Sequence, residues 1–291
     1  MKVVTHNDRF HADDIFGVAT LQLVFGVDEL EIIRTRDEDI IKNADIVLDV
    51  GGQYDPEKGR FDHHQPGGAG ERSSGIQYAS FGLIWKKYGE KLAGSEHAAA
   101  DIDSGLVQAI DAGDNGIVIA KQIEEMPREY VINMVAGVFG PTWEEDESLL
   151  DNNFTYMLSF ARELLKREIA HARARVNAIP HIERAYKESE DKRILVLNEY
   201  YPWTSPVKEL PEVFFVISPN KAGTMWRVNA VQEELFVNKK SFPKEWAGLR
   251  NEELQKISSV KDALFCHRAL FMAAAKSREG AKELAQKALT Q

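Results

Sequence analysis

The sequence predicts an α/β protein, with a mostly parallel sheet in an N-terminal domain and a smaller mixed α/β domain at the C-terminal end. Short apolar runs alternate with helical patterns in the first half of the chain, and this order produces right-handed crossovers between parallel strands. After Arg193 the pattern changes to several short strands separated by turns. The length of 291 residues and the hydrophobic content of 44% suit two soluble domains.

β-branched and apolar runs that end in turn residues predict the N-terminal strands, and apolar residues at helical spacing predict the helices. In chain order these are strand 2–5, helix 15–25, strands 31–35 and 45–52, and helices 75–88, 96–112 and 130–143. Asp13 or Asp14 can cap the first helix. Asp49 and two glycines end the third strand, and Gly140-Pro141 ends the last helix.

A long amphipathic pattern over residues 148–187 predicts a connecting helix, which Pro180 should break or kink. The predicted strands that follow are 194–197, 213–217, 226–231 and 263–267. A terminal helix over 277–289 has Glu279 near its start, as in an N-terminal capping arrangement. We therefore divide the chain into a catalytic domain (1–147), a connecting segment (148–190) and a substrate-binding domain (191–291).

Composition excludes several classes of protein. The net charge of −10, from 36 basic and 46 acidic residues, argues against a broad basic surface for long nucleic acid. No apolar run approaches the roughly 20 residues of a membrane span, and residues 1–5 do not resemble a signal peptide. The single cysteine, Cys266, suits a reducing compartment and is expected to be a buried strand residue rather than a nucleophile. We expect a cytoplasmic protein with no membrane partner.

Potential metal ligands gather at or just past predicted strand ends, as at His6, Asp49 and His63. In open α/β sheets, ligand-binding residues collect at the carboxyl ends of strands. The candidates in the first domain are His6, His11, Asp13, Asp49, His63, His64, Asp111 and Asp114. Imidazole and carboxylate together suit Mn²⁺, Zn²⁺, Fe²⁺ or Co²⁺, whereas Mg²⁺ and Ca²⁺ prefer sites made of oxygen alone.

These ligands are too many for one tetrahedral ion. Two ions roughly 3.5–4 Å apart, sharing a bridging carboxylate, would use them all and would promote displacement at phosphorus. Each residue also has a simpler interpretation: the histidines as polar loop residues, Asp13 as a helix cap, and Asp49, Asp111 and Asp114 as turn residues. The G-x-S-x-G, P-loop and dinucleotide-binding fingerprints are absent. The chemistry indicated is hydrolysis of a phosphoester or phosphoanhydride.

Several motifs together resemble the melanocyte-proliferating-gene family, once called metal-dependent protein hydrolases. They are THNDRFHADD at 5–14, RTRD at 34–37, DVGGQYDP at 49–56, DHHQ at 62–65 and DAGDNG at 111–116, followed by WRV at 226–228, WAGLR at 246–250 and KSREGA at 276–281. The resemblance spans nearly the whole chain. It implies kinship with the DHH phosphoesterases and a DHH-like fold for the N-terminal domain, and a eukaryotic member of the family is described as a 3′–5′ RNA exonuclease.

The resemblance implies a role for each residue of the first motif. His6, His11 and Asp13 occupy the positions of a histidine followed by Asp-x-Asp in DHH enzymes, so a histidine stands in place of the first aspartate. By the same mapping, Asp49 would bridge both ions.

The remaining motifs of the N-terminal domain would complete the site. His63 would bind the second ion together with Asp111 or Asp114. His64 would face the substrate phosphate, stabilising charge or protonating the leaving group. Asp62 is interpreted as the residue that orients the histidine pair.

The resemblance also implies a substrate-binding element near the C-terminal end. Related DHH enzymes use a Gly-Gly-His element, and the matching stretch here lacks both glycines and the histidine. Lys276, Ser277 and Arg278, at a helix start, are expected to contact phosphate instead. His267 and Arg268 would join them.

We therefore expect a metal-dependent phosphoesterase, specifically a 3′–5′ exonuclease on RNA or short oligonucleotides that uses water activated by two metal ions. Mn²⁺ is the expected metal, with Mg²⁺, Zn²⁺, Fe²⁺ and Co²⁺ as alternatives. A small-nucleotide phosphatase or pyrophosphatase stays open, as does a catalytically quiet metal- or nucleotide-binding module. The sequence is compatible with a homo-oligomer.

Overall fold

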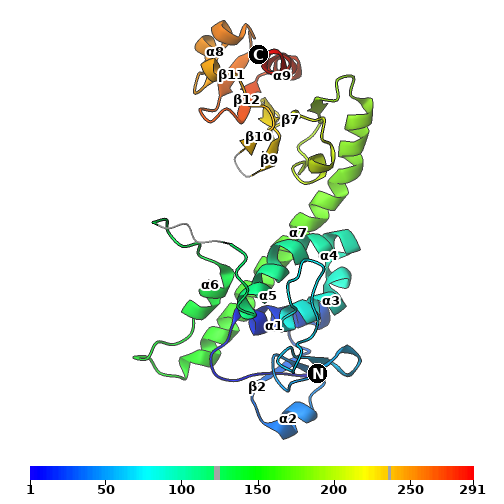
Figure 1. The fold of residues 1–291 in the computed structure, drawn as a ribbon, viewed down its shortest axis with the longest axis vertical. Helices are drawn as coiled ribbons and strands as arrows, with labels where there is room; N and C mark the ends of the chain where they lie inside the picture. Colours follow the sequence, from blue (N-terminus) through cyan, green and yellow to red (C-terminus); the bar gives the residue numbers. More distant parts are fainter. Residues whose placement is uncertain (121–124, 235–236) are drawn as a thin grey trace. The chain divides into compact units, whose positions relative to one another are not determined.

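The structure, a computed structural model, describes residues 1–120, 125–234 and 237–291. It forms two compact units, Met1–Arg173 and Ala174–Gln291. Helix α7 (Leu149–Glu188) contributes to both of them (Figure 1). Each unit combines helices with a sheet, so the predicted α/β class is confirmed.

The first unit contains a five-stranded sheet with the strand order β2-β1-β3-β5-β4. Its strands are β1 (Lys2–Thr5), β2 (Glu31–Arg34), β3 (Ile46–Leu48), β4 (Tyr54–Asp55) and β5 (Arg60–Phe61). β1 pairs in parallel with β2 and β3, β3 pairs in parallel with β5, and β4 runs antiparallel to β5. The carboxyl ends of β1, β3 and β5 therefore point to one edge, where His6, Asp49 and Asp62 follow directly.

The first unit also contains helical segments, of which the first and third α-helices contact the sheet directly. The segments are α1 (Ala12–Phe25), α2 (Glu38–Lys42), α3 (Ser80–Ala93), α4 (Glu96–Ile102), the π-helical turn η2 (Asp103–Val107), α5 (Gln108–Asp114) and α6 (Ile132–Val138), with a 3₁₀ turn η1 (Pro56–Lys58) between β4 and β5. α1 packs against α3, and Phe16 and Phe81 meet with ring centroids 5.6 Å apart. α6 is much shorter than the helix predicted over 130–143.

The start of α1 differs from the prediction. The helix begins at Ala12, and its N-cap is His11 rather than Asp13 or Asp14. Asp14 is the third helical residue, and its Oδ1 accepts the His11 N–H at 2.8 Å, as in a capping box. Asp13 is thus available for contacts outside its own helix.

The N-terminus of α3 is closed by carboxylates from two other helices. Asp13 accepts the N–H groups of Ser80 at 3.0 Å and Phe81 at 2.7 Å, and Asp111 accepts that of Gly82 at 3.1 Å. Helix N-termini carry unpaired N–H groups and a partial positive charge, so buried carboxylates are stabilised there. This capping fixes α1, α3 and α5 relative to one another.

The second unit contains a five-stranded sheet in the order β11-β12-β8-β7-β6, in which only β6 and β7 run parallel. Its strands are β6 (Ile194–Val196), β7 (Phe215–Pro219), β8 (Trp226–Ala230), β11 (Ala263–Cys266) and β12 (Met272–Ala275), and a separate two-stranded ladder joins β9 (Gln232–Glu234) to β10 (Val237–Asn238). The helical segments are η3 (Pro206–Glu209), η4 (Lys244–Trp246), α8 (Asn251–Ser258) and α9 (Arg278–Thr290).

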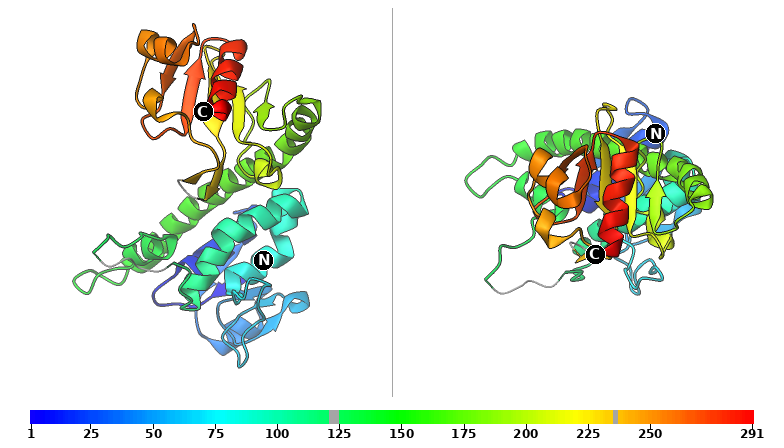
Figure 2. Two further views of the ribbon diagram at one scale, coloured as in Figure 1. Left: turned by 45° about the horizontal axis from the view of Figure 1, so that its top comes forward. Right: turned by 90° about the horizontal axis from the view of Figure 1, so that it is seen from above.

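Alternate residues of this sheet face two apolar clusters. Phe215 and Ile217 pack with α9, which lies on one face of the sheet (Figure 2), whereas Val216 packs with the C-terminal part of α7. This is the period of two that a strand covered on both faces requires. Cys266 is a buried strand residue, and burial raises the pKa of its thiol to about 12, so it does not suit a nucleophile.

Of the break or kink predicted at Pro180, the break is wrong, because α7 continues through this residue. A proline inside a helix loses one hydrogen bond and costs roughly 3 kcal/mol. Ala178 and Ile182, on either side, are buried in an apolar cluster of the second unit. Their burial offsets the local cost.

Within the described parts of the chain, no helix has both the length and the apolar character needed to cross a membrane.

We predict that Gly82→Ala destabilises the protein by about 1–3 kcal/mol, the usual range for overpacking a core. The added methyl carbon would lie 1.9 Å from Asp111 Oδ2 and 2.8 Å from Arg72 Nη2. Urea unfolding of the purified protein measures the effect. Gly137→Ala in α6 is the matched control, because its Cβ meets nothing within 4 Å, and equal unfolding midpoints for both variants would contradict the capping role.

Candidate metal centre

One edge of the first sheet brings most of the predicted site residues together. His6 follows β1, Asp49 follows β3, and Asp62 starts the segment that follows β5. Asp13 enters from the first turn of α1 and Asp114 from the last residue of α5. The side chains thus reach one place from five separate elements.

Asp49 lies at the centre of this arrangement. Its Oδ2 is 3.3 Å from His6 Nε2, and its Oδ1 is 3.3 Å from His63 Nε2. The backbone at Asp49 adopts a φ of +56°, a left-handed conformation that costs energy in a non-glycine residue and is common at functional sites. Each carboxylate oxygen therefore faces a different histidine.

The hydrogen bonding of His6 fixes its tautomer. Nδ1 lies 2.6 Å from the carbonyl oxygen of Asn7, which can only accept, so Nδ1 carries a hydrogen. Nε2 then faces Asp49 and, at 3.5 Å, Asp14 Oδ2. Burial by itself would lower the pKa of His6, but attraction to Asp49 and Asp14 outweighs it and raises the pKa to about 9. His6 Nε2 therefore lies beside two carboxylates, where a bound cation is stabilised.

His63 occupies a similar position. Its Nε2 lies 3.2 Å from Asp114 Oδ2 and 3.3 Å from Asp49 Oδ1. Burial opposes protonation, yet Asp114 and Asp49 together raise the pKa of this ring to about 11. Asp49 itself is buried, which would raise its pKa, but His6 and His63 hold that pKa well below its usual range.

Unsatisfied buried atoms indicate that these groups suit a metal ion. His63 Nε2, Asp49 Oδ1 and Asp14 Oδ2 are buried and have no well-formed hydrogen bond within the described residues. Native proteins pair nearly all such atoms. A divalent cation would satisfy nitrogen and carboxylate lone pairs together.

Among the residues that the structure describes, three groups of side chains have ligand atoms within 4.8 Å of one another. They are His6, His11 and Asp49; Asp13, His63 and Asp114; and Asp49, Asp62, His63 and His64. The first two groups contain six of the seven predicted metal ligands. His11 is exposed, whereas Asp13 is fully buried, and burial raises the pKa of Asp13 well above its usual value.

Asp111 is not brought to these groups. Its Oδ2 accepts Arg72 Nη1 at 2.7 Å, and its Oδ1 accepts the Gly82 N–H. Burial raises the pKa of Asp111 to about 7 in spite of the opposing charge of Arg72. Arg72 also contacts Asp103 at 2.8 Å, so Asp111 belongs to a structural ion-pair network.

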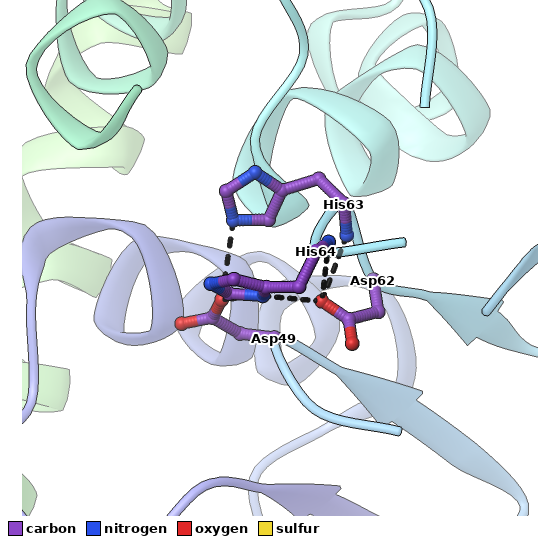
Figure 3. A group of neighbouring side chains, drawn as sticks. All are labelled: Asp49, Asp62, His63 and His64. Atoms are coloured by element: carbon purple, nitrogen blue, oxygen red, sulfur yellow. Dashed lines mark hydrogen bonds and ion pairs between the residues drawn. The ribbon is translucent and has the colours of Figure 1, made fainter. Parts of the chain in front are cut away.

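Asp62 and His64 form a separate hydrogen-bonded pair beside Asp49 (Figure 3). Asp62 Oδ1 lies 2.7 Å from His64 Nδ1 and also accepts the backbone N–H groups of His63 and His64. Asp62 Oδ2 accepts the N–H of Gly52. Asp62 is buried, whereas the His64 side chain is 62% exposed, so an anchored carboxylate holds an accessible imidazole.

A cavity of about 600 Å³ opens onto these residues. It is lined by His6, His11, Asp49, Asp62, His64 and Asp114, and by Arg36 and Asn133, which sequence reasoning did not place in the site. Arg36 stands in the RTRD motif just after β2, a signal that could have identified it. Asp14 stands in the THNDRFHADD motif and had a comparable signal, whereas Asn133 lies outside the motifs.

Three of the predicted substrate contacts, Lys276, Ser277 and Arg278, lie around the start of α9. Ser277 is the N-cap: its Oγ accepts the Gly280 N–H at 3.0 Å, and its own N–H donates to Asp262 Oδ2 at 2.8 Å. The Arg278 guanidinium lies 5.8 Å from the Trp226 ring centroid. Asp262 therefore already uses part of the helix terminus that was predicted to bind phosphate.

The remaining two predicted contacts, His267 and Arg268, follow β11. His267 Nδ1 accepts the Ala269 N–H at 3.1 Å, and its ring centroid lies 4.4 Å from that of Phe271. These contacts anchor the His267 ring within its own turn.

Comparison with known proteins gives matches along the whole chain. Residues 2–289 match the model of the MYG1_exonuc family, described as "Uncharacterised protein family (UPF0160)". The MYG1 exonuclease of Homo sapiens is 29% identical over 326 residues, covering 100% of this chain and 86% of the relative. The MYG1 exonuclease of Bos taurus is 30% identical, covering 100% and 85%. A MYG1 protein of Saccharomyces cerevisiae is 30% identical, covering 99% and 95%.

We predict that binding of a divalent metal depends on Asp114 and not on Asp111. Asp114→Asn should weaken Mn²⁺ binding by more than about 10-fold, a loss that is usual even for residues that only hydrogen-bond to ligands. Asp111→Asn should leave Mn²⁺ affinity within about twofold but lower stability by about 1–3 kcal/mol, since Arg72 and Gly82 lose a charged acceptor.

Titration calorimetry with Mn²⁺ and urea unfolding of the metal-free variants measure the two effects. The variants carry the same chemical change on the same helix, so each is the control for the other. Loss of Mn²⁺ affinity in the folded Asp111 variant would refute this assignment.

Proposed function

The chain belongs to the MYG1_exonuc family, as its motifs predict, and on this premise we propose that it is a metal-dependent exonuclease that acts in the 3′–5′ direction on RNA or a short oligonucleotide. Relatives aligned over the full chain carry the name exonuclease, which supports a nuclease-type function. The position of Asp49 carries the proposal, since each of its oxygens lies 3.3 Å from a different histidine nitrogen. A carboxylate that faces two ligand sets suits a pair of metal ions.

Two sets of ligands would each hold one ion, and Asp49 of the first set would also serve the second, because its Oδ1 lies 3.3 Å from His63 Nε2. The two sets are His6, His11 and Asp49, and Asp13, His63 and Asp114. Mixed nitrogen and oxygen ligands favour Mn²⁺, Zn²⁺, Fe²⁺ or Co²⁺ over Mg²⁺, and we propose Mn²⁺. When bound, such ions lower the pKa of water and offset charge on the phosphate. Because His11 belongs to the first set, the altered first motif keeps its number of ligands.

His64 would act on the substrate from the side of the cavity. Asp62 holds Nδ1 of this ring, which leaves Nε2 available for the leaving oxygen. Water would lose a proton to the solvent and bond through its oxygen to phosphorus, while the bond from phosphorus to the leaving oxygen breaks. His64 would donate a proton to that leaving oxygen and regain one from the solvent. Asp62 is thus proposed as the positioning residue for His64 and His64 as the catalytic acid.

The second unit is proposed to bind substrate through Lys276 and Arg278, which carry charge beside the capped start of α9. Ser277 already caps the helix, so its hydroxyl is the least suited of the three. His267 and Arg268 complete the proposed set. Kinship with the DHH phosphoesterases, a cytoplasmic location and homo-oligomerisation stay predictions from the sequence.

We predict that the purified protein with Mn²⁺ shortens a 5′-labelled RNA oligonucleotide one nucleotide at a time. His64→Ala should lower kcat by about 10²–10⁴-fold, the usual contribution of general acid–base catalysis, and leave Mn²⁺ stoichiometry unchanged. Asp49→Ala should lose both activity and bound Mn²⁺. Denaturing gels and metal analysis of the same samples give these readouts, with exposed His97→Ala as the control.

Other outcomes would identify the alternative functions. Cleavage of pAp or pyrophosphate with intact RNA would indicate a small-nucleotide phosphatase or pyrophosphatase. An Mn²⁺-loaded protein that cleaves neither RNA nor DNA oligomers nor these small compounds would indicate a catalytically quiet binding module. Either result would refute the exonuclease proposal.

A further inference from the structure

A second cavity adjoins the candidate metal centre. Its volume is about 680 Å³, and it shares Arg36, Val50 and Gly51 with the cavity of the metal site. It is bounded by α2, the end of β3 and the β4–β5 connection, all within the first unit. A chain-like substrate bound at the metal centre could therefore continue past Gly51 into this second cavity, which we name the side groove.

The side groove is basic although the chain as a whole is acidic. Its lining contains four cations, Arg36, Lys42, Lys58 and Arg60, and one carboxylate, Glu38. The net charge of the whole chain is −10. A local cationic lining beside a carboxylate-rich site favours an anion with more than one charged group.

Most of this positive charge is not neutralised by close carboxylates. Arg60 donates to the carbonyl oxygens of Lys42, Ala44 and Lys58, which hold its side chain in place without cancelling its charge. Arg36 meets Asp8 only at 3.7 Å. Lys58 pairs with Asp55 at 2.7 Å but is 73% exposed, where such pairs contribute little.

The lining of the groove is also partly apolar. Ile41, Val47 and Val50 line it beside the cations, and the last two are at most 7% exposed. A lining that combines cations with apolar side chains suits a single strand, whose phosphates and sugar or base faces differ in polarity. A mononucleotide at the metal centre would leave this surface unused.

We propose that the side groove binds the phosphates on the 5′ side of the scissile one, so that the substrate is a single-stranded oligonucleotide several nucleotides long. This inference rests on the proposed function and extends it to the substrate class. Arg36 lies where the two cavities meet and contacts the phosphate next to the scissile bond. Lys42, Lys58 and Arg60 bind those further along.

The test compares oligonucleotides of two lengths. Fluorescein-labelled RNA of two and of eight nucleotides is bound to the chelator-treated protein and measured by anisotropy at several salt concentrations, and cleavage of both is measured with Mn²⁺. Lys42→Ala/Lys58→Ala should weaken binding of the eight-mer by about fivefold to tenfold. The slope of log affinity against log salt concentration should become less steep by roughly 0.7 for each lost phosphate contact. The kcat/KM for the two-mer should not change.

Matched controls separate charge from folding. Lys42→Arg/Lys58→Arg keeps the charge and should bind as the unaltered protein does. Lys91→Ala/Lys166→Ala removes the same charge from exposed positions on α3 and α7 and should leave eight-mer binding unchanged. Arg60 is not used, because its side chain also holds backbone carbonyls.

Two results would refute the proposal that the side groove binds substrate. One is an eight-mer affinity that Lys42→Ala/Lys58→Ala does not lower, and the other is an equal loss of affinity for the two-mer and the eight-mer. Failure of the proposed function is distinguishable from both. An unaltered protein that cleaves neither length but binds the eight-mer through Lys42 and Lys58 would refute the exonuclease and support the groove. Equal cleavage of both lengths with no effect of these lysines would support the exonuclease and refute binding in the side groove.

Discussion

The buried Asp49 carboxylate, held between two histidine rings, is the constraint on which the first unit depends. Burying a carboxylate is costly unless positive charge or hydrogen-bond donors compensate for it. Here His6 and His63 do so at 3.3 Å, from strands on either side of the one that ends at Asp49. The strand order of the sheet is therefore also the order of the ligands. The left-handed backbone at Asp49 shows that local strain is accepted to keep this position.

Carboxylates of one chemical type serve different purposes according to their surroundings. Asp111 is matched by Arg72 and by the N-terminus of α3, so it stabilises the fold. Asp114, one helical turn away, forms an ion pair with His63 and lines the cavity. Asp13 does both, because it caps α3 while lying within ligand distance of His63. A site built this way is coupled to the packing of α1, α3 and α5.

Charge distribution links the site to the proposed substrate. An acidic chain repels polynucleotides in general, which lowers non-specific binding. The side groove reverses this sign locally, beginning at Arg36, where the two cavities meet. In the proposed complex the reacting phosphate lies beside His64, which Asp62 anchors, and the rest of the strand extends from there into the side groove. The proposals for chemistry and for substrate length thus rest on different residues.

The sequence by itself determined the family, the α/β class and the segments that supply ligands, because motifs and hydrophobic periodicity are local. It placed His6, Asp49 and His63 at strand ends, and the structure brings them together. Only the tertiary structure distinguished the role of Asp114 from that of Asp111, because Asp111 pairs with Arg72, which is distant along the chain. It alone revealed the two-residue strands β4 and β5, the unbroken helix at Pro180 and the position of Arg36 between two cavities. Strands of two residues are too short to give a periodic pattern, and the other two features depend on contacts between distant segments.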